Sequence, residues 1–214
     1  MTVGRLHILT DFFFQQRFPH EELARRAIAG GADTIQFRQK TGGIRHKLYS
    51  ASRTAEVCRE AGVPLLIDDH IELFLATEAA GVHVGQTDLP VGLVRRILGD
   101  AAIIGATANT TRQALEAEEA GASYIGFGPV FPTQSKDNPA SLRGLDGLAD
   151  VCARVRIPVI AIAGITVDRV RDVLEAGAHG VAVMTAVTNA PDPEASTRGF
   201  RAAIDRWIAD TVHA

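Results

Sequence analysis

The feature that most constrains the fold is a repeated junction, in which an Ala- and Glu-rich helical segment ends at a glycine and a short apolar run follows. The junction occurs in the stretches that begin at Ala29, Glu60, Ala79, Glu119 and Glu175. In each, the glycine stands where the residue after a helix adopts the left-handed conformation, and the next apolar run is too short for a helix. The chain therefore alternates helices with short buried strands.

Apolar runs without this junction complete the pattern. The expected strands lie at about 5–10, 33–38, 64–68, 81–85, 102–106, 122–127, 157–162 and 180–184. Helical periodicity occupies segments between them, at 21–28, 45–61, 113–120 and 167–176, and a last helix is expected at about 194–211. This alternation over 214 residues predicts an α/β fold, a single (β/α)8 TIM barrel of eight parallel strands that spans 1–214.

A doubly wound parallel sheet uses the same unit and is the alternative fold. Its nucleotide-binding fingerprint is incomplete in this sequence. Gly126 and Gly128 follow an expected strand, but no third glycine is in place. Pro129 and Pro132 stand where a helix should open. The closed barrel is therefore the favoured fold.

The charge balance argues against a polyanionic partner. The formal net charge is −3 and the pI is about 6.2, so nucleic acid is not an expected partner and any anion site must be local. Cys58 and Cys152 lie in helical patterns without metal-ligand spacing, as expected for free thiols of a reducing compartment. No signal-peptide pattern or long apolar run occurs, so we expect a soluble, cytoplasmic protein without a membrane partner. Homo-oligomerisation stays open.

Polar residues collect after the expected strands, at the ends where the active site of a (β/α)8 barrel lies. They are Gln36, Arg38 and Lys40 after the second strand, Asp68 and Asp69 after the third, Gln86 and Asp88 after the fourth, Thr107 and Asn109 after the fifth, Thr133, Ser135 and Lys136 after the sixth, Gly164 after the seventh, and Met184 and Thr185 after the eighth. These residues define one candidate mouth.

The basic residues of the mouth indicate an anion. Arg38 and Lys40 are two apart along a strand, which puts both on one face, although a solvated strand end is the alternative. Together with Lys136 they would repel one another unless an anion lies between them. Thr133, Ser135 and Lys136 offer two hydroxyls and an ammonium, a composition that suits either a phosphate cradle or a polar surface turn.

The acidic residues of the mouth indicate a metal ion. Asp69 and Asp88 come from neighbouring strands, and a pair of carboxylates suits Mg2+, which completes its shell with waters and phosphate oxygens. Asp68 and Asp69 could instead cap a helix that begins near Ile71. Cations and carboxylates at one mouth suggest a diphosphate with Mg2+. The glycine-rich ends of the last two strands are typical of a second phosphate site, so two phosphorylated ligands are expected.

At these positions the chain resembles the thiamine-phosphate synthase family, together with its close relative, thiazole tautomerase. Two blocks are the most specific, Gly81-Val-His-Val-Gly-Gln-Thr-Asp-Leu-Pro90 and Tyr124-Ile-Gly-Phe-Gly-Pro-Val-Phe-Pro-Thr-Gln-Ser-Lys136. Weaker matches lie at 36–40, 66–69, 104–110, 158–165 and 177–183. The resemblance covers almost the whole chain in order.

The resemblance implies a Mg2+-dependent transferase that joins hydroxymethylpyrimidine diphosphate to hydroxyethylthiazole phosphate and releases diphosphate through a dissociative, carbocation-forming step. By position, the pyrimidine diphosphate would contact Gln36, Phe37, Arg38, Gln39, Lys40, Asp68, Thr107 and Lys136. The thiazole phosphate would contact Thr133, Gln134, Ser135, Gly164, Met184 and Thr185. The implied metal ligands are Asp69 and Asp88, and the implied catalytic residues are Arg38, Lys40, Thr107 and Lys136. No protein nucleophile is evident, and this chemistry needs none.

Four positions depart from the family's usual pattern. Asp68 stands where Asn is common, His70 where Arg is common, Thr107 where Ser is common, and Asn109 where His is common. Two alternative functions therefore stay open. A thiazole tautomerase commonly carries a catalytic His after the fifth strand, where this chain has none, and it need not keep both metal-site acids. A non-catalytic ligand-binding member would result if Asp68 abolished turnover.

Overall fold

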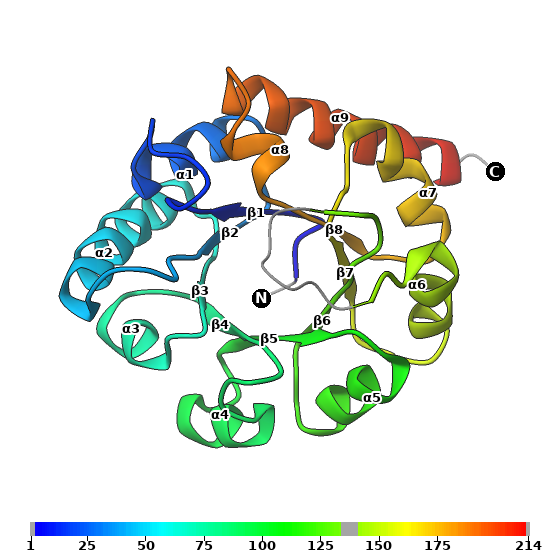
Figure 1. Cartoon of the computed structure of the whole chain (residues 1–214), viewed down its shortest axis with the longest axis horizontal. Coiled ribbons are helices and arrows are strands. Elements are labelled where there is room, and N and C mark those ends of the chain that lie inside the picture. Colours follow the sequence, from blue (N-terminus) through cyan, green and yellow to red (C-terminus); the bar gives the residue numbers. More distant parts are fainter. Residues whose placement is uncertain (1–2, 134–140, 213–214) are drawn as a thin grey trace.

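The strands form one closed barrel, which the helices surround (Figure 1). The structure is a computed structural model, and it describes residues 3–133 and 141–212. Neighbouring strands are parallel and follow one another in sequence order, with the last strand pairing with the first. The strands are β1 Leu6–Thr10, β2 Thr34–Phe37, β3 Leu65–Asp68, β4 Gly81–Val84, β5 Ile103–Ala108, β6 Tyr124–Phe127, β7 Val159–Ile162 and β8 Gly180–Val183. The predicted (β/α)8 barrel is confirmed.

Helices follow the strands around the outside of the barrel. They are α1 His20–Ala29, α2 Ile44–Ala61, α3 Ile71–Ala76, α4 Val91–Leu98, α5 Thr111–Glu119, α6 Gly144–Cys152, α7 Val170–Glu175, α8 Thr185–Thr188 and α9 Pro193–Val212. The helix expected at 167–176 begins with a short 3-10 turn, η1 Val167–Arg169, before α7. Helix α9, orange to red in Figure 1, packs against both α1 and α7 and so completes the outer ring.

The glycine junctions behave as predicted in most of the repeats. Gly62 follows α2 with φ 68°, and Gly121 follows the last turn of α5 with φ 94°. The junction that begins at Ala79 is the exception, because Gly81 is the first residue of β4 rather than a helix end. A Cβ at Gly81 would lie 1.9 Å from the carbonyl oxygen of Ile103. This glycine therefore permits a close approach between β4 and β5.

Strand side chains alternate between two packed layers. The larger layer lies between the strands and the helices and includes Ile35, Phe37 and Ile67. The smaller layer fills the interior of the barrel, and its buried members are Leu9, Leu66, Ile103, Tyr124, Ile160 and Ala182. Because Phe37 belongs to the outer layer, its neighbours Gln36 and Arg38 face the interior and its open end.

A polar pair lies inside the barrel among these apolar side chains. The hydroxyl of Tyr124 is 2.8 Å from Nδ1 of His83, and the ring of His7 meets that of Tyr124 edge-on at a centroid distance of 5.3 Å. Gly105 provides the space for this pair, since a Cβ there would lie 2.2 Å from Tyr124 and 2.4 Å from His83. Any side chain at position 105 would displace the two rings.

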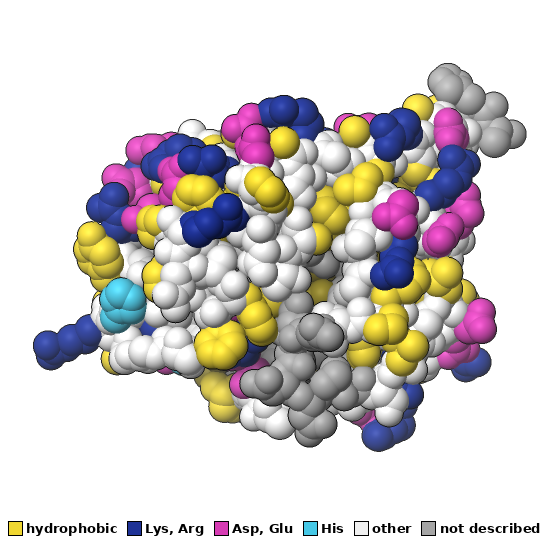
Figure 2. All heavy atoms as spheres, turned by 45° about the horizontal axis from the view of Figure 1, so that its top comes forward, with side chains coloured by type: hydrophobic (Ala, Val, Ile, Leu, Met, Phe, Trp, Pro, Cys, Tyr) yellow, Lys and Arg dark blue, Asp and Glu magenta, His cyan; other side chains and the backbone are white. Residues whose placement is uncertain are grey.

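The outer surface carries mixed charge. On the face shown in Figure 2, basic side chains lie among acidic ones. Exposed ion pairs also form within single helices, such as Arg112 with Glu116 in α5 and Arg171 with Glu175 in α7. None of the helices in the described part of the chain combines the length and the hydropathy that a membrane span requires.

Candidate functional site

The carboxyl ends of the strands open into a cavity of about 1030 Å3. The sequence-predicted residues that line it are Gln36, Arg38, Lys40, Asp68, Asp69, Asp88, Thr107, Thr133, Gly164, Met184 and Thr185. The predicted site residues Gln134, Ser135 and Lys136 lie outside the described residues. In the described chain, the candidates for binding two phosphorylated ligands and a metal ion therefore share one cavity.

The side chains of Phe37 and Gln39 do not reach this cavity, in contrast to the expectation that the whole run from Gln36 to Lys40 contacts a ligand. Phe37 packs in the outer layer, with its ring centroid 4.4 Å from that of His20. Gln39 is buried and donates to the carbonyl of Thr41 at 3.3 Å. The alternation of the chain sends these two side chains away from the cavity.

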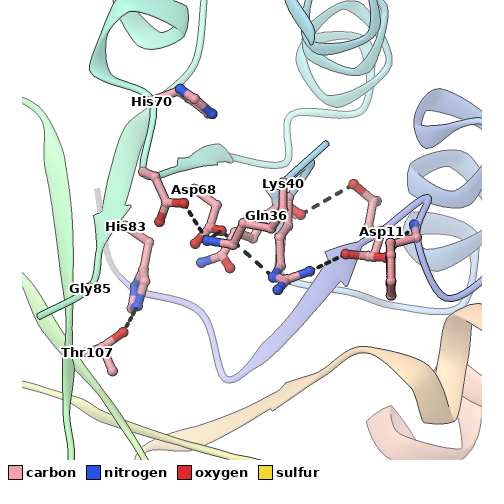
Figure 3. A network of polar contacts seen from close by, with 12 residues as sticks. Asp11, Gln36, Lys40, Asp68, His70, His83, Gly85 and Thr107 are labelled. Carbon is pink, nitrogen blue, oxygen red and sulfur yellow. Dashed lines mark hydrogen bonds and ion pairs between the residues drawn. The ribbon is translucent and has the colours of Figure 1, made fainter. Parts of the chain in front are cut away.

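Arg38 is held in place by a buried carboxylate, that of Asp11. Asp11 directly follows β1, is 1% exposed and forms an ion pair with Nη1 of Arg38 (Figure 3). Its other carboxylate oxygen accepts hydrogen bonds from the backbone N–H groups of Phe13 at 2.7 Å and Phe14 at 3.0 Å. Asp11 is not among the sequence-predicted site residues, although it is an acidic residue at the end of the first strand. The guanidinium is therefore fixed before any ligand binds.

Lys40 is paired with two carboxylates. Its Nζ lies 2.8 Å from Oδ2 of Asp68 and also contacts Asp69 (Figure 3). The contact with Asp68 is an ion pair rather than a well-directed hydrogen bond, because Oδ2 has no aligned donor among the described residues. Arg38 Nε is 3.8 Å from the same oxygen. Arg38 and Lys40 are therefore already paired with carboxylates of the chain, whereas Lys136, the third cation of the expected anion site, lies outside the described residues.

Burial and the neighbouring charges have opposite effects on the pKa values of Asp68 and Lys40. Burial raises the pKa of Asp68, and the charge of Lys40 offsets this only in part. For Lys40, burial alone would lower the pKa, but Asp68 and Asp69 outweigh it and the pKa is raised. Lys40 is thus firmly charged. Its charge offsets only part of the effect of burial on Asp68.

Asp69 and Asp88 approach each other closely enough for their carboxyl groups to hydrogen-bond. Gly85 N–H donates to Oδ2 of Asp88 at 2.7 Å, which fixes that carboxylate. Asp69 has a left-handed backbone with φ 62°, and its N–H donates to the carbonyl of His83 at 2.9 Å. Few non-glycine residues adopt this conformation, and those that do are concentrated at functional sites.

The two carboxylates differ in acidity. Burial acts to raise the pKa of Asp69, but the hydrogen bond and charge of Lys40 outweigh it, and the pKa is lowered. Burial raises the pKa of Asp88, and the nearby charge of Asp69 adds to this, although Gly85 N–H opposes it. Two facing carboxylates repel each other unless a proton or a cation lies between them. This arrangement suits a divalent cation.

The donor set that this arrangement offers a cation is small. Among the residues that the structure describes, no group of three or more His, Cys, Asp and Glu side chains could hold a metal. A site of two carboxylates leaves most of the coordination shell to water and to a ligand, as Mg2+ prefers. The alternative that Asp68 or Asp69 caps a helix is wrong, because α3 begins after His70 and has no side-chain cap.

The cavity also meets the polar pair inside the barrel. Nε2 of His83 lies 2.9 Å from the hydroxyl oxygen of Thr107, and Figure 3 shows the two side chains pointing toward each other from β4 and β5. His83 thus connects Thr107, in the cavity wall, with Tyr124, in the interior. His83 is not among the sequence-predicted site residues, although it lies within the specific 81–90 block.

The wall after β7 and β8 has a different character. Ala163 and Gly164 both have left-handed backbones, with φ 83° and 64°. A Cβ at Gly164 would lie 2.5 Å from the carbonyl oxygen of Pro132. Arg169 donates to the carbonyl of Gly164 at 2.7 Å and stacks on the ring of Phe131 at 4.5 Å. Arg169 therefore adds a cation to the wall where the sequence predicts a second phosphate site.

Comparison with known proteins identifies the family. A family model described as thiamine monophosphate synthase matches residues 10–187. The chain is 63% identical to the thiamine-phosphate synthase of Salinibacter ruber over 204 residues, which are 95% of this chain and 90% of that relative. The chain belongs to the thiamine monophosphate synthase family.

Further members of the thiamine monophosphate synthase family agree in sequence and in fold. The thiamine-phosphate synthase of Methanocella arvoryzae is 45% identical over 202 residues, covering 94% of this chain and 95% of that relative. A solved structure of thiamine phosphate pyrophosphorylase from Pyrococcus furiosus is 35% identical, with a TM-score of 0.87 over 95% of this chain and 96% of that one. The likeness extends over nearly the full length of each protein.

Two departures from the thiamine monophosphate synthase pattern have a structural partner here. Asn109 lines the cavity, and its side-chain N–H donates to the carbonyl of Gly128, which ties the loop after β5 to the end of β6. His70 lies between Lys47 and Glu72, at 2.8 Å from each. Both side chains are thus engaged by the chain itself.

Proposed function

We propose that this chain is an active thiamine-phosphate synthase, which joins hydroxymethylpyrimidine diphosphate to hydroxyethylthiazole phosphate and releases diphosphate. One observation carries the proposal: Arg38 and Lys40 interleave with carboxylates on one wall of the cavity. A diphosphate with its metal ion is the ligand that suits such a wall. The 63% identity to a relative of that name supports the same reaction.

Departure of diphosphate is the step that this wall would assist. As the carbon–oxygen bond breaks, the electron pair stays with the diphosphate, and negative charge grows on its oxygens. Arg38 and Lys40 would stabilise this charge, with Lys136 as a third proposed cation. Asp11 keeps the Arg38 guanidinium fixed, so little reorganisation is needed when the charge develops.

Asp69 and Asp88 would hold Mg2+, since they form a close pair with no third protein ligand among the described residues. When bound, Mg2+ would neutralise part of the diphosphate charge and make it a better leaving group. Lys40 would then exchange its contact with Asp69 for a phosphate oxygen. Asp68 remains beside Lys40 and keeps its position.

Loss of diphosphate leaves a cation on the exocyclic methylene of the pyrimidine, which the aminopyrimidine ring stabilises by resonance. The thiazole nitrogen then supplies an electron pair and forms the new carbon–nitrogen bond. Gln36 and Thr107, which line the cavity, would orient the pyrimidine through hydrogen bonds. Gly164, Met184 and Thr185 would receive the thiazole phosphate, together with the predicted contacts at Thr133, Gln134 and Ser135.

The experiment is a two-substrate assay of the purified protein with Mg2+. We expect thiamine phosphate and diphosphate in equal amounts, no product when either substrate is omitted, and loss of activity with a chelator. Lys40→Met should lose most of the activity while it keeps the fold. Isomerisation of a thiazole phosphate without diphosphate release would establish a tautomerase instead. Tight binding of both ligands without any turnover would establish a non-catalytic member.

A further inference from the structure

Lys47 is a buried lysine whose ammonium contacts an imidazole and a backbone carbonyl. It lies in the first half of α2, only 6% exposed, and its Nζ is 2.8 Å from Nε2 of His70 and 3.5 Å from the carbonyl oxygen of Lys40. In the described part of the chain, no ion pair joins Lys47 to an acidic side chain. Buried lysines are rare unless they are paired, because an uncompensated charge is costly to remove from water. The position therefore indicates an anion that the free protein lacks.

The contacts of Lys47 orient it, while the charge of Glu72 acts on it from beyond the His70 ring. Nδ1 of His70 lies 2.8 Å from a carboxylate oxygen of Glu72, so this nitrogen carries the proton and Nε2 accepts from Lys47. Glu72 is 58% exposed at its side chain, and an imidazole ring separates it from the ammonium. An ammonium has three protons, and the two contacts are both to neutral acceptors. Lys47 thus has a proton left to donate to a further partner.

Lys47 lies near the proposed diphosphate wall, the side of the cavity that carries Arg38 and Lys40. Lys47 and His70 line a hollow of about 450 Å3 whose wall also includes Lys40, Asp69 and Asp88. Those last three residues line the large cavity as well. The hollow is therefore an outward extension of the cavity at the carboxylate pair, on the side of α2 and α3.

We propose that Lys47, oriented by His70, is an additional diphosphate-binding residue that contacts the outer phosphate of the substrate and of the released diphosphate. The inference rests on the proposed function, because it takes the diphosphate to lie at Lys40 and the carboxylate pair. The ligand is a diphosphate anion, alone or with Mg2+. No bond is made or broken at Lys47.

The test is calorimetric titration of inorganic diphosphate, with Mg2+ present, into the wild-type protein and Lys47→Met. We expect the substitution to weaken diphosphate binding about tenfold, since it removes a charge-assisted hydrogen bond. Arg53→Met is the matched control: it removes one positive charge from the same helix, where Arg53 is half exposed and pairs with Glu21. The control should bind diphosphate as the wild type does. Unchanged affinity in Lys47→Met would overturn the proposal.

Two further variants keep the result interpretable. Lys40→Met should weaken diphosphate binding if the proposed function is right; if it does not, the diphosphate wall itself is misplaced and both proposals fail. If only Lys47→Met is without effect, the further inference alone fails. Lys47→Gln keeps a neutral donor toward His70, and it should lose affinity as Lys47→Met does while its melting temperature stays near that of the wild type. Retained affinity in Lys47→Gln would show that the charge is not used.

Discussion

Nε2 of His83 lies 2.9 Å from the hydroxyl oxygen of Thr107, at the boundary between the barrel interior and the cavity. On the other side of the ring, Nδ1 lies 2.8 Å from the hydroxyl of Tyr124. Burial raises the pKa of Tyr124, so this hydroxyl stays protonated, and Gln36 is hydrogen-bonded to it as well. We expect Tyr124 to donate to Nδ1 and His83 to donate from Nε2, which leaves the Thr107 proton for a ligand.

Tyr124→Phe tests this arrangement. The substitution removes one oxygen and frees His83 to take either tautomer, so Thr107 would present its proton to the ligand only part of the time. We expect kcat/KM to fall by about three- to tenfold, in line with the loss of one hydrogen bond. Nitrogen NMR of the wild-type protein should show His83 protonated at Nε2, and a proton at Nδ1 would contradict the prediction.

Asp68→Asn tests the carboxylate that departs from the family pattern. Asp68 now partly neutralises Lys40 and lies near Arg38, so its loss should leave both cations more available to an anion. We expect tighter binding of the pyrimidine diphosphate and unchanged binding of the thiazole phosphate. Separate titrations of Mg2+ decide whether Asp68 is also a metal ligand, since a weaker Mg2+ affinity in the variant would assign it that role.

Asp69 offers a pair of substitutions that separate charge from backbone conformation. Asp69→Asn keeps a side chain that tolerates the left-handed backbone at φ 62°, whereas Asp69→Ala does not. Both should lose Mg2+ binding and most activity, but only Asp69→Ala should also lose stability, by about 1 kcal/mol. Asp88→Ala should resemble Asp69→Asn in losing Mg2+ binding. Wild-type turnover in any of these at ordinary Mg2+ would contradict the metal assignment.

The buried ring of His7 predicts a dependence of stability on pH. Burial lowers its pKa from 6.5 to about 4 in the folded protein. Above pH 6.5 the ring is neutral in both the folded and the unfolded chain. As the pH falls from 6.5 toward 4, His7 becomes protonated in the unfolded chain but stays neutral in the folded one. The free energy of unfolding should therefore fall on acidification, by up to about 1.4 kcal/mol per pH unit for this histidine.

His7→Gln isolates that contribution. The side-chain amide can still donate to the carbonyl of Gly4, which lies 3.0 Å from Nε2 of His7, but it does not titrate. Denaturant unfolding at several values of pH should show a shallower loss of stability in the variant than in the wild type. Equal slopes would mean that His7 is protonated in the folded state as readily as in the unfolded one.

The fold was predictable because its signals are local. A glycine that ends a helix and an apolar run that fits only a strand recur along the chain, as at Gly62 and Gly121, and their number selects a closed barrel. The placement of Arg38 and Lys40 on one face followed from strand alternation. The same rule, applied to Phe37 and Gln39, would have excluded their side chains from the cavity.

The pairings within the site were not predictable, because they depend on where loops from different units meet. Asp11 is separated from Arg38 by a whole helix, and the sequence contains no sign that its carboxylate reaches back to that guanidinium. Lys47 has the spacing of an ordinary helix residue, and only the packed structure shows that its ammonium is buried beside His70. Arg169 likewise reaches the cavity through the geometry of one 3-10 turn.

Because Lys40 is already paired with Asp68 and Asp69, an anion that binds Lys40 has to replace a carboxylate as its counter-ion. An incoming anion has to displace carboxylates that are tethered to the chain, and therefore always present at high local concentration. Under the proposed function, a diphosphate that brings its own metal ion would give Asp69 a new partner as it takes Lys40, whereas a simple monoanion would leave Asp69 without one. The ion pairs of the free protein would thus act as a threshold that favours metal-loaded diphosphates over the abundant free anions of a cell.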